Sequence, residues 1–358
     1  MTFLADLQSL VECESPSEDL SACQAVVELA VEISNQRLST AGKILQVEGR
    51  PVFWWGAANP KVVLLAHLDT VWPIGSYLPL WSIAGDVIRG PGVFDMKAGF
   101  LQAIYALRDI PGAQDSVALV ATTDEELGSQ TSREFIKKVA AQSQAVLVLE
   151  AALEGKVKTA RKGTAMYQIC VQGRASHAGL EPEKGINATT EMAHQILKII
   201  EMENPDLGTT VVPTVLKSGT TTNTVPAEAT LDIDIRSFFA EELIRVDTAI
   251  QALQPIHSGA SLAITGGINR PPLEFSSTQE LYAKLEAVAD SIGQAPIGHA
   301  SVGGASDGNF AAAAGAKVLD GLGAIGSGAH APSEQVFLSS IQDRIALLTA
   351  FIKELIRE

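Results

Sequence analysis

Short, uninterrupted runs of apolar residues alternate with segments of helical periodicity along much of the chain. The runs at 62–66, 117–121 and 145–149 are apolar at every position, which is typical of strands buried on both faces of a parallel sheet. The segments 95–110 and 132–142 between them have apolar residues at helical spacing. Strands that alternate with helices in this way predict an α/β fold with a mostly parallel sheet.

The pattern changes from about residue 164. Alternating apolar and polar positions predict strands here, and the expected order becomes strand, helix, strand, strand, helix, strand, as in a ferredoxin-like domain. In one strand, Leu231, Ile233 and Ile235 alternate with charged residues, which predicts one buried and one polar face. We therefore predict an α/β domain formed by 1–163 and 272–358, with a ferredoxin-like α+β domain inserted at 164–271.

The first long helix is expected near the N-terminus, where apolar residues recur at helical spacing from Leu20 to Ile33. Ser17 stands ahead of two acidic residues and is the expected N-cap, because a serine hydroxyl can accept hydrogen bonds from the free N–H groups of a first turn. No basic region followed by an unbroken apolar stretch precedes it, so we expect no signal peptide.

The composition narrows the range of functions. A chain of 358 residues with 46% hydrophobic and 19% charged residues is long enough for two globular domains. The net charge of −15 and the pI near 4.9 argue against nucleic acid as a partner, because phosphate binding needs a basic surface. No charge-free apolar run reaches membrane-spanning length, so no membrane association is expected. The three cysteines form no CxxC pair, which favours reduced thiols in a cytoplasmic protein.

Residues that can bind a metal stand where apolar runs end. His67, Glu126 and Glu150 each end or closely follow such a run, and ligands of open α/β sheets bind beyond the carboxyl ends of the strands. Asp95 follows a glycine-rich segment, and His330 follows another apolar run. Two imidazoles and three carboxylates suit zinc and, less selectively, cobalt or manganese. They suffice for two ions if one carboxylate bridges them.

Neighbouring acidic residues have other expected roles. Asp69 lies two residues beyond His67, and on an extended strand its carboxylate could accept the second imidazole N–H and fix the ring. Glu125 is left over from the acidic triplet at 124–126, and a carboxylate beside two metals can take a proton from water and pass it to a leaving amine. Asp124 is expected to belong to the turn.

Each of these residues alone has a structural alternative. A single strand-end histidine is more often structural, an acidic triplet is more often a solvated turn, and Asp95 could be a helix N-cap. Five ligands at the expected places together favour the metal site. A dinucleotide site is not predicted, because Asp95 occupies the last glycine position of the GxGxxG motif that Gly90 and Gly92 begin.

Several motifs, in order along most of the chain, resemble a single family. The stretches HLDTV, GPGVFDMKAG, TTDEELGS, VLVLE, GRASHAG and GAHAPSEQV look like those of the two-zinc exopeptidases and deacylases of peptidase clan MH. This family includes glutamate carboxypeptidase of the carboxypeptidase G type, acetylornithine deacetylase, succinyl-diaminopimelate desuccinylase and aminoacylase. HLDTVWPIG and GGASDGNFAA resemble the glutamate carboxypeptidases in particular.

The resemblance implies two zinc ions per subunit, a homodimer, and a role for the inserted domain as a lid and dimerisation domain. It also implies that Asp95 bridges the two ions and that Glu125 is the general base and acid. The implied ligands are His67, Asp95 and Glu150 for one ion and Asp95, Glu126 and His330 for the other.

Four residues of the inserted domain acquire roles from the same resemblance. His177 of the SHAG stretch would steady the developing oxyanion, and it would reach the site from the partner subunit together with Asn223. Arg236 and Arg270 would bind a substrate carboxylate, which suits the guanidinium fork. Two alternatives stay open: Arg236 could pair with an aspartate on its own strand, and Arg270 could be a solvated charge at the hinge.

The predicted function is zinc-dependent hydrolysis of an amide bond that releases a C-terminal amino acid, as in glutamate carboxypeptidases. The substrate would be a small peptide or an N-acyl amino acid. An alternative with the same chemistry is an N-acyl amino acid deacylase of the acetylornithine type. An alternative of another class is a non-catalytic, metal-bound sensor. The presence of Glu125 together with every expected ligand argues against a sensor.

Overall fold

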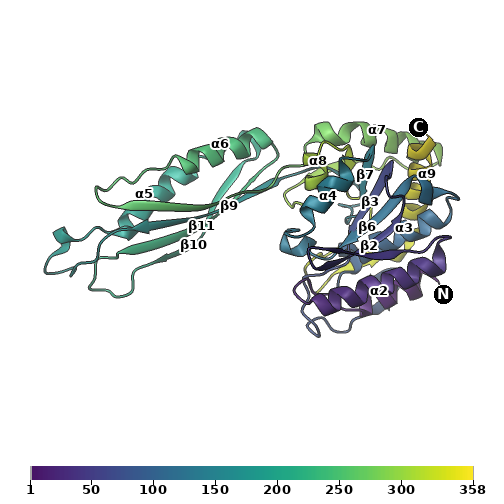
Figure 1. Ribbon diagram of the computed structural model, residues 1–358, viewed down its shortest axis with the longest axis horizontal. Coiled ribbons are helices and arrows are strands. Elements are labelled where there is room, and N and C mark those ends of the chain that lie inside the picture. The colour runs from purple at the N-terminus through teal and green to yellow at the C-terminus, as the bar shows by residue number, and fades with distance from the viewer. Residues whose placement is uncertain (1, 358) are drawn as a thin grey trace. The chain divides into compact units, whose positions relative to one another are not determined.

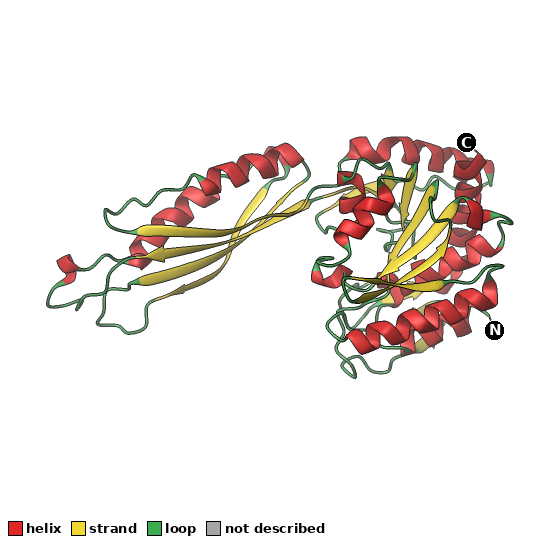
Figure 2. Ribbon diagram, viewed as in Figure 1, coloured by secondary structure: helices red, strands yellow, loops and turns green. Residues whose placement is uncertain are grey.

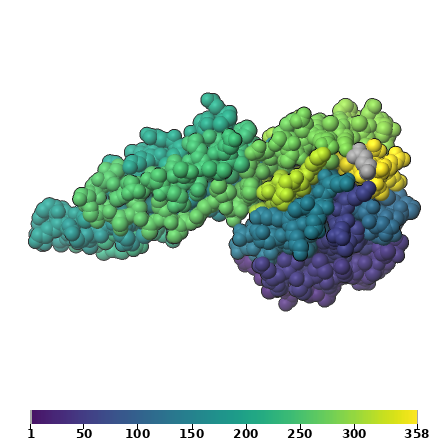
Figure 3. All heavy atoms as spheres, turned by 45° about the horizontal axis from the view of Figure 1, so that its top comes forward, coloured from purple at the N-terminus to yellow at the C-terminus, as the bar shows by residue number. Residues whose placement is uncertain are grey.

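The computed structural model describes residues 2–357, and the chain divides into two compact units (Figure 1). The main divisions fall after Ala160 and after Leu273. Segments from both ends of the chain belong to unit 1, which contains the purple and yellow residues of the space-filling view (Figure 3). Unit 1 consists of Met1–Ala160, Glu274–Val302 and Ser306–Glu358, and unit 2 consists of Arg161–Leu273 and Gly303–Ala305.

Unit 1 is built around a six-stranded sheet with the strand order β1-β2-β6-β3-β7-β14. Strands β6, β3, β7 and β14 pair in parallel, whereas β1 and β2 add an antiparallel edge. Every residue of β3, β6 and β7 is buried, so the predicted mostly parallel, covered sheet is confirmed. The strands are β1 (Lys43–Val47), β2 (Arg50–Gly56), β3 (Val62–His67), β6 (Val117–Thr122), β7 (Ala145–Val148) and β14 (Val318–Leu319).

Helices cover both faces of this sheet (Figure 2). Helices α3 and α9 contact each other and β3, whereas α8 contacts β3 and β7 and packs against α4. The rings of Phe53 on β2 and Phe100 on α3 meet edge to face with their centroids 5.2 Å apart, which joins helix and sheet in the core. The helices are α1 (Phe3–Glu12), α2 (Leu20–Arg37), α3 (Ala98–Arg108), α4 (Arg133–Ala140), α7 (Phe275–Ser291), α8 (Asp307–Ala313) and α9 (Ile341–Arg357).

The N-cap of α2 is Asp19, so the prediction of Ser17 was wrong. The Asp19 carboxylate accepts hydrogen bonds from the backbone N–H groups of Ser21 and Ala22, at 2.9 and 3.0 Å. Asp19 directly precedes the first helical residue, whereas Ser17 lies two residues too early for its short side chain to reach these donors. The Ser17 hydroxyl is used elsewhere, beside the candidate metal ligands.

Two smaller sheets complete unit 1. One has the order β15-β16-β5-β4 and is antiparallel, and the other pairs β13 with β8. Because β15 and β16 are adjacent antiparallel strands, the loop that joins them is held at both ends, and this loop carries His330. The strands are β4 (Ser82–Ala84), β5 (Val87–Arg89), β8 (Val157–Arg161), β13 (His299–Val302), β15 (Gly326–Ser327) and β16 (Gln335–Phe337).

Unit 2 has the predicted strand, helix, strand, strand, helix, strand order. Its four-stranded antiparallel sheet has the order β10-β11-β9-β12, and α5 and α6 both contact β9 and β11. Leu231, Ile233 and Ile235 of β11 are buried in its core while their neighbours are partly exposed, as the alternation predicted. The elements are β9 (Gly163–Gln172), α5 (Ala188–Ile200), β10 (Thr210–Ser218), β11 (Glu228–Ser237), α6 (Ala240–Gln251) and β12 (Ser261–Arg270).

Two features bear on the cellular environment of the chain. Cys13, Cys23 and Cys170 are free thiols, as the sequence predicted. Within residues 2–357, no helix combines the length and apolar composition that crossing a bilayer requires. The cytoplasmic location stays a prediction.

Candidate functional site

The five predicted metal ligands lie in unit 1, at strand ends and in two connecting segments. His67 is the last residue of β3, Glu126 lies in the turn after β6, and Glu150 follows the end of β7. Because β6, β3 and β7 are parallel neighbours, their carboxyl ends bring these side chains to one edge of the sheet. Asp95 extends from the turn before α3, and His330 from the loop between β15 and β16.

These side chains form two overlapping groups that share Asp95. In the first, Nε2 of His67 lies 3.3 Å from Oδ1 of Asp95 and 3.7 Å from Oε1 of Glu150. In the second, Nε2 of His330 lies 3.3 Å from Oδ2 of Asp95 and 3.1 Å from the Glu126 carboxylate. The donor atoms of each group lie within 4.8 Å of one another. Asp95 thus offers one carboxylate oxygen to each group.

The pKa values at the site show how strongly the carboxylates favour positive charge. Hydrogen bonds to Asp95 and Glu126 raise the pKa of His330 to about 10. Burial alone would lower the pKa of His67, but hydrogen bonds to Asp69 and Asp95 raise it well above its ordinary value. Burial would also raise the pKa of Asp95, yet hydrogen bonds to the two histidines hold it below its usual range. The site therefore attracts cations, whether protons or metal ions.

The residues present fit a pair of divalent metal ions. They supply two imidazole nitrogens and three carboxylates without a thiolate, a donor set that suits zinc and, less selectively, cobalt or manganese. Glu150 directs Oε1 toward His67, while its Oε2 lies 3.9 Å from Nζ of Lys158. The two groups have one member in common, so a bridging carboxylate is available for both positions.

Asp69 contacts the ring of His67 through its backbone carbonyl and, less closely, its carboxylate. The nearest partner of His67 Nδ1 is the backbone carbonyl oxygen of Asp69, at 3.0 Å, whereas the carboxylate Oδ1 lies 3.5 Å away. The assigned strand β3 ends at His67, and the N–H of Leu68 still donates to Thr122 O of β6 at 2.9 Å. Oδ2 of Asp69 accepts hydrogen bonds from the Ser17 hydroxyl at 2.7 Å and from the Glu126 backbone N–H at 3.2 Å.

The acidic triplet after β6 divides into three different environments. Oδ2 of Asp124 accepts hydrogen bonds from Thr131 N, Thr131 Oγ1 and Ser132 N, at 2.9, 2.6 and 3.1 Å, so this residue organises the turn toward α4. Glu126 belongs to the second ligand group. Glu125 starts the turn, directly precedes Glu126 in the chain and belongs to neither group.

Glu334 is a site residue that the sequence analysis missed. Its buried carboxylate accepts hydrogen bonds from the backbone N–H groups of Gly92, Phe94 and Asp95, at 3.1, 3.0 and 3.1 Å. Nε1 of Trp72 donates a further one at 3.0 Å. Glu334 therefore holds the turn that carries the shared ligand. The sequence did contain a sign of this role, because Glu334 is the acidic residue of GAHAPSEQV, the stretch that also carries the candidate ligand His330.

His177 and Asn223 lie side by side in unit 2. An antiparallel bridge joins His177 to Thr224, and the Asn223 carbonyl accepts a hydrogen bond from Ala178 N at 2.9 Å. Nδ1 of the exposed His177 accepts hydrogen bonds from the backbone N–H groups of Gly179 and Leu180, both at 3.1 Å. In the neutral ring the proton must then sit on Nε2, which makes this atom a donor.

Arg236 and Arg270 stand on β11 and β12, the strands on either side of β9, and both pair in register with Thr164 of β9. Arg236 makes a two-point ion pair with Asp234 of its own strand, with Nε 2.9 Å from Oδ1 and Nη2 3.2 Å from Oδ2. The alternative expected for Arg236, an ion pair with an aspartate of its own strand, is thus present in the structure. Arg270 is 5% exposed, so it is not a solvated hinge charge.

The chain matches known proteins over nearly its whole length. The sequence profile of peptidase family M20/M25/M40 matches residues 63–354. Carboxypeptidase G2 of Pseudomonas sp. (strain RS-16) is 29% identical over 316 residues, which cover 84% of this chain and 75% of that protein. Succinyl-diaminopimelate desuccinylase of Aliarcobacter butzleri is 26% identical over 306 residues, which cover 80% and 82%.

Solved structures match the fold as well. The crystal structure of aminopeptidase PepT from Bacillus cereus superposes with a TM-score of 0.77 at 20% identity, covering 99% of this chain and 98% of that one. The ligand groups, the fold and the family profile agree with one another. The chain therefore belongs to peptidase family M20/M25/M40 and is a metallohydrolase.

Proposed function

We propose that this metallohydrolase cleaves an amide bond and releases a C-terminal amino acid, with glutamate as the preferred leaving group. The observation that carries the proposal is the sharing of Asp95 by two ligand groups, one of which contains Glu126, the residue that follows Glu125 in the same turn. The similarity to carboxypeptidase G2 supports the direction of cleavage. The similarity to a desuccinylase keeps N-acyl amino acid deacylation as the second candidate.

The metal proposed is zinc: His67, Asp95 and Glu150 would hold one ion, and Asp95, Glu126 and His330 would hold the other. When bound, they would supply Lewis-acid polarisation of the amide carbonyl and activation of water. Glu125 takes the proton from the attacking water and passes it to the nitrogen of the leaving amine, a role supported by its place next to Glu126 in the turn after β6. Asp69 holds His67 and the turn of Glu126 while this happens.

His177 is proposed to donate a hydrogen bond from Nε2 to the oxygen that becomes negative during attack. The two backbone N–H groups on Nδ1 support this role, because they leave the proton on Nε2. We further propose that His177 and Asn223 act from the partner subunit of a homodimer. Full activity of a strict monomer in solution would contradict this part of the proposal.

Arg236 and Arg270 are proposed to bind the carboxylate of the amino acid that leaves. Both oppose Thr164 from the strands on either side of β9, and cross-strand partners project from the same face of a sheet. Asp234 holds the guanidinium fork of Arg236, so a substrate carboxylate would have to compete with it or bind beside it.

The test is release of amino acids by the zinc-loaded protein from Xaa-Glu dipeptides, pteroyl-glutamate and N-acetyl amino acids. We expect release of glutamate from the first two substrates. Release of amino acids from the acetylated substrates alone would favour the second candidate function, N-acyl amino acid deacylation. No turnover with two zinc ions bound would favour the sensor alternative.

A substitution separates the chemical step from metal binding. Glu125→Gln is expected to abolish turnover while the zinc content stays at two ions, because the ligands are unchanged. Glu134→Gln makes the same change on the exposed surface of α4 and serves as the control. Loss of zinc in Glu125→Gln would make Glu125 a ligand and would contradict its proposed role.

A further inference from the structure

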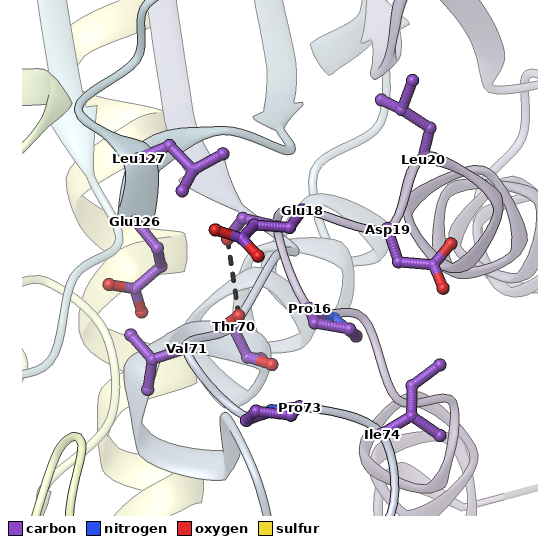
Figure 4. A pocket seen from close by; sticks show the side chains of 11 residues that line it. Pro16, Glu18, Asp19, Leu20, Thr70, Val71, Pro73, Ile74, Glu126 and Leu127 are labelled. Atoms are coloured by element: carbon purple, nitrogen blue, oxygen red, sulfur yellow. Dashed lines mark hydrogen bonds between the residues drawn. The ribbon is translucent and has the colours of Figure 1, made fainter.

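A cavity of about 750 Å³ adjoins the second ligand group in unit 1 (Figure 4). Glu126 forms part of its wall, so the cavity opens directly beside the candidate metal centre. The other walls come from the link between α1 and α2 and from the loop that follows β3. A cavity of this size accommodates a small organic group.

Backbone hydrogen bonds hold these walls in place. Thr70 pairs with Pro16 in a parallel bridge, its N–H donates to Ser15 O at 2.8 Å, and its carbonyl accepts from Ser17 N at 3.2 Å. The N–H of Gly75 donates to Oε1 of Glu14 at 2.8 Å, which ties down the far end of the same loop. The cavity is therefore a formed feature of unit 1.

The lining combines apolar side chains with negative charge. Leu20, Val71 and Ile74 contribute apolar surface, and all three are more than a third exposed. Among the residues that the structure describes, the lining contains carboxylates and no basic side chain. Asp19 is occupied as the cap of α2, whereas Glu18 has no hydrogen-bond or ion-pair partner within residues 2–357. The Glu18 side chain extends toward the side of the cavity where Glu126 lies (Figure 4).

We infer that this cavity binds the acyl part of the amide substrate, and that Glu18 selects neutral aromatic or cationic acyl groups over dicarboxylic ones. The inference rests on the proposed amide hydrolysis and narrows its substrate class. The leaving amino acid is excluded from the cavity because its free carboxylate would face Glu18, and no basic side chain of the lining offsets this charge, whereas Glu126 is engaged in its ligand group. A succinyl group is disfavoured for the same reason, because its second carboxylate would also face Glu18.

The test compares three substrates that share glutamate as the leaving group: N-benzoylglutamate, lysylglutamate and N-succinylglutamate. For the zinc-loaded protein we expect kcat/KM to be highest for the first two. Glu18→Lys should raise kcat/KM for the succinyl substrate and lower it for the lysyl substrate, each by about fivefold to tenfold, because exposed charge pairs are individually weak. The neutral benzoyl substrate should change less than about twofold.

Glu32→Lys is the matched control, because it makes the same charge change on the exposed side of α2, about 18 Å along the helix from Leu20. It should leave the order of the three substrates unchanged. Glutamate release with the same kcat/KM ratios of the three substrates in Glu18→Lys and wild type would overturn the inference and leave the proposed function standing.

A binding measurement decides the matter without turnover. Calorimetry measures the affinity of the protein for N-methylbenzamide and N-methylsuccinamate. Each compound carries one of the acyl groups and lacks the glutamate. Wild type should bind the benzamide more tightly, and Glu18→Lys should gain affinity for the succinamate. If wild type and Glu18→Lys bound each compound with the same affinity, the inference would be overturned. A chain that binds as expected but hydrolyses none of the three substrates would contradict the proposed function instead.

Discussion

The hydroxyl of Ser17 donates a hydrogen bond of 2.7 Å to Oδ2 of Asp69, and both side chains are buried. The same oxygen accepts the backbone N–H of Glu126 at 3.2 Å, and the backbone carbonyl of Asp69 contacts the ring of His67. One aspartate therefore connects a wall of the acyl cavity with a residue from each of the two ligand groups.

Removal of the Ser17 hydroxyl should weaken metal binding without removing a ligand. Ser17→Ala leaves Oδ2 of the buried Asp69 with one hydrogen-bond donor fewer, so the turn of Glu126 is held less firmly. We expect zinc affinity or kcat to fall about tenfold, as for other residues that orient metal ligands. Competition with a chromophoric chelator measures the affinity. Ser17→Thr keeps the hydroxyl and should restore most of it.

Substitution of the shared ligand should affect both metal positions. Asp95→Ala removes a donor from each group and is expected to reduce the bound metal from two ions to less than one. Glu126→Ala removes a donor from the second group only, so one ion should stay bound. Metal analysis after equilibrium dialysis gives the counts, with the exposed Asp290→Ala as control. Equal metal contents in Asp95→Ala and Glu126→Ala would argue against a bridge.

Loss of the Glu334 carboxylate should destabilise the turn that carries Asp95. Glu334→Ala leaves three backbone N–H groups and the indole of Trp72 without their acceptor, and we expect a loss of about 3 kcal/mol in the free energy of unfolding. Zinc affinity should fall with it. Chemical unfolding of the metal-free protein measures the loss of stability. Substitution of the exposed Glu241 of α6, Glu241→Ala, is the control. An unchanged zinc affinity would contradict the positioning role.

A buried carboxylate should make the stability of unit 2 depend on pH. Glu191 accepts hydrogen bonds from Ile256 N, His257 N and Gln195 Nε2, at 3.0, 2.7 and 2.6 Å. Burial alone would raise its pKa, but these bonds lower it from 4.5 to about 2. A carboxyl whose pKa is lower when folded stabilises the protein above its unfolded pKa and loses this effect as the pH falls toward the folded value.

The contribution of Glu191 is therefore complete above about pH 5 and declines between about pH 4.5 and pH 2. The difference in unfolding free energy between wild type and Glu191→Gln should shrink by about 2 kcal/mol from pH 6 to pH 3. Urea unfolding of the metal-free protein at both values measures it. Glu201→Gln, on the exposed surface just after α5, should show no such change. A difference that is constant with pH would contradict the assignment.

The sequence analysis could place His67, Glu126 and Glu150 at one edge of a sheet because their strands are short, fully apolar and separated by helices. Parallel strands connected in this way must end on the same side, so the edge follows from the pattern. The alternation around Ile233 likewise indicated which face of unit 2 is buried.

Three other contacts of this protein could not be predicted from the pattern of apolar and polar residues. The carboxylate of Asp69 accepts the hydroxyl of Ser17 across 52 positions of sequence, and periodicity reports no contact at that separation. Glu334 reaches the turn of Asp95 across 239 positions of sequence, and no local pattern reports a contact at that separation. The pairing of Arg236 with Asp234 competes with other partners that the sequence makes equally available.

The sequence by itself determined the two fold types, the kinds of ligand and the strand ends at which three of them lie, because these follow from hydrophobic periodicity and residue chemistry. The tertiary structure alone decided that Asp95 faces both histidines, that Glu334 and Ser17 hold the site, and that Glu18 lines a cavity beside Glu126. The physical reason is that these contacts join segments far apart in the chain, and only the packed sheet and its connecting loops set their distances.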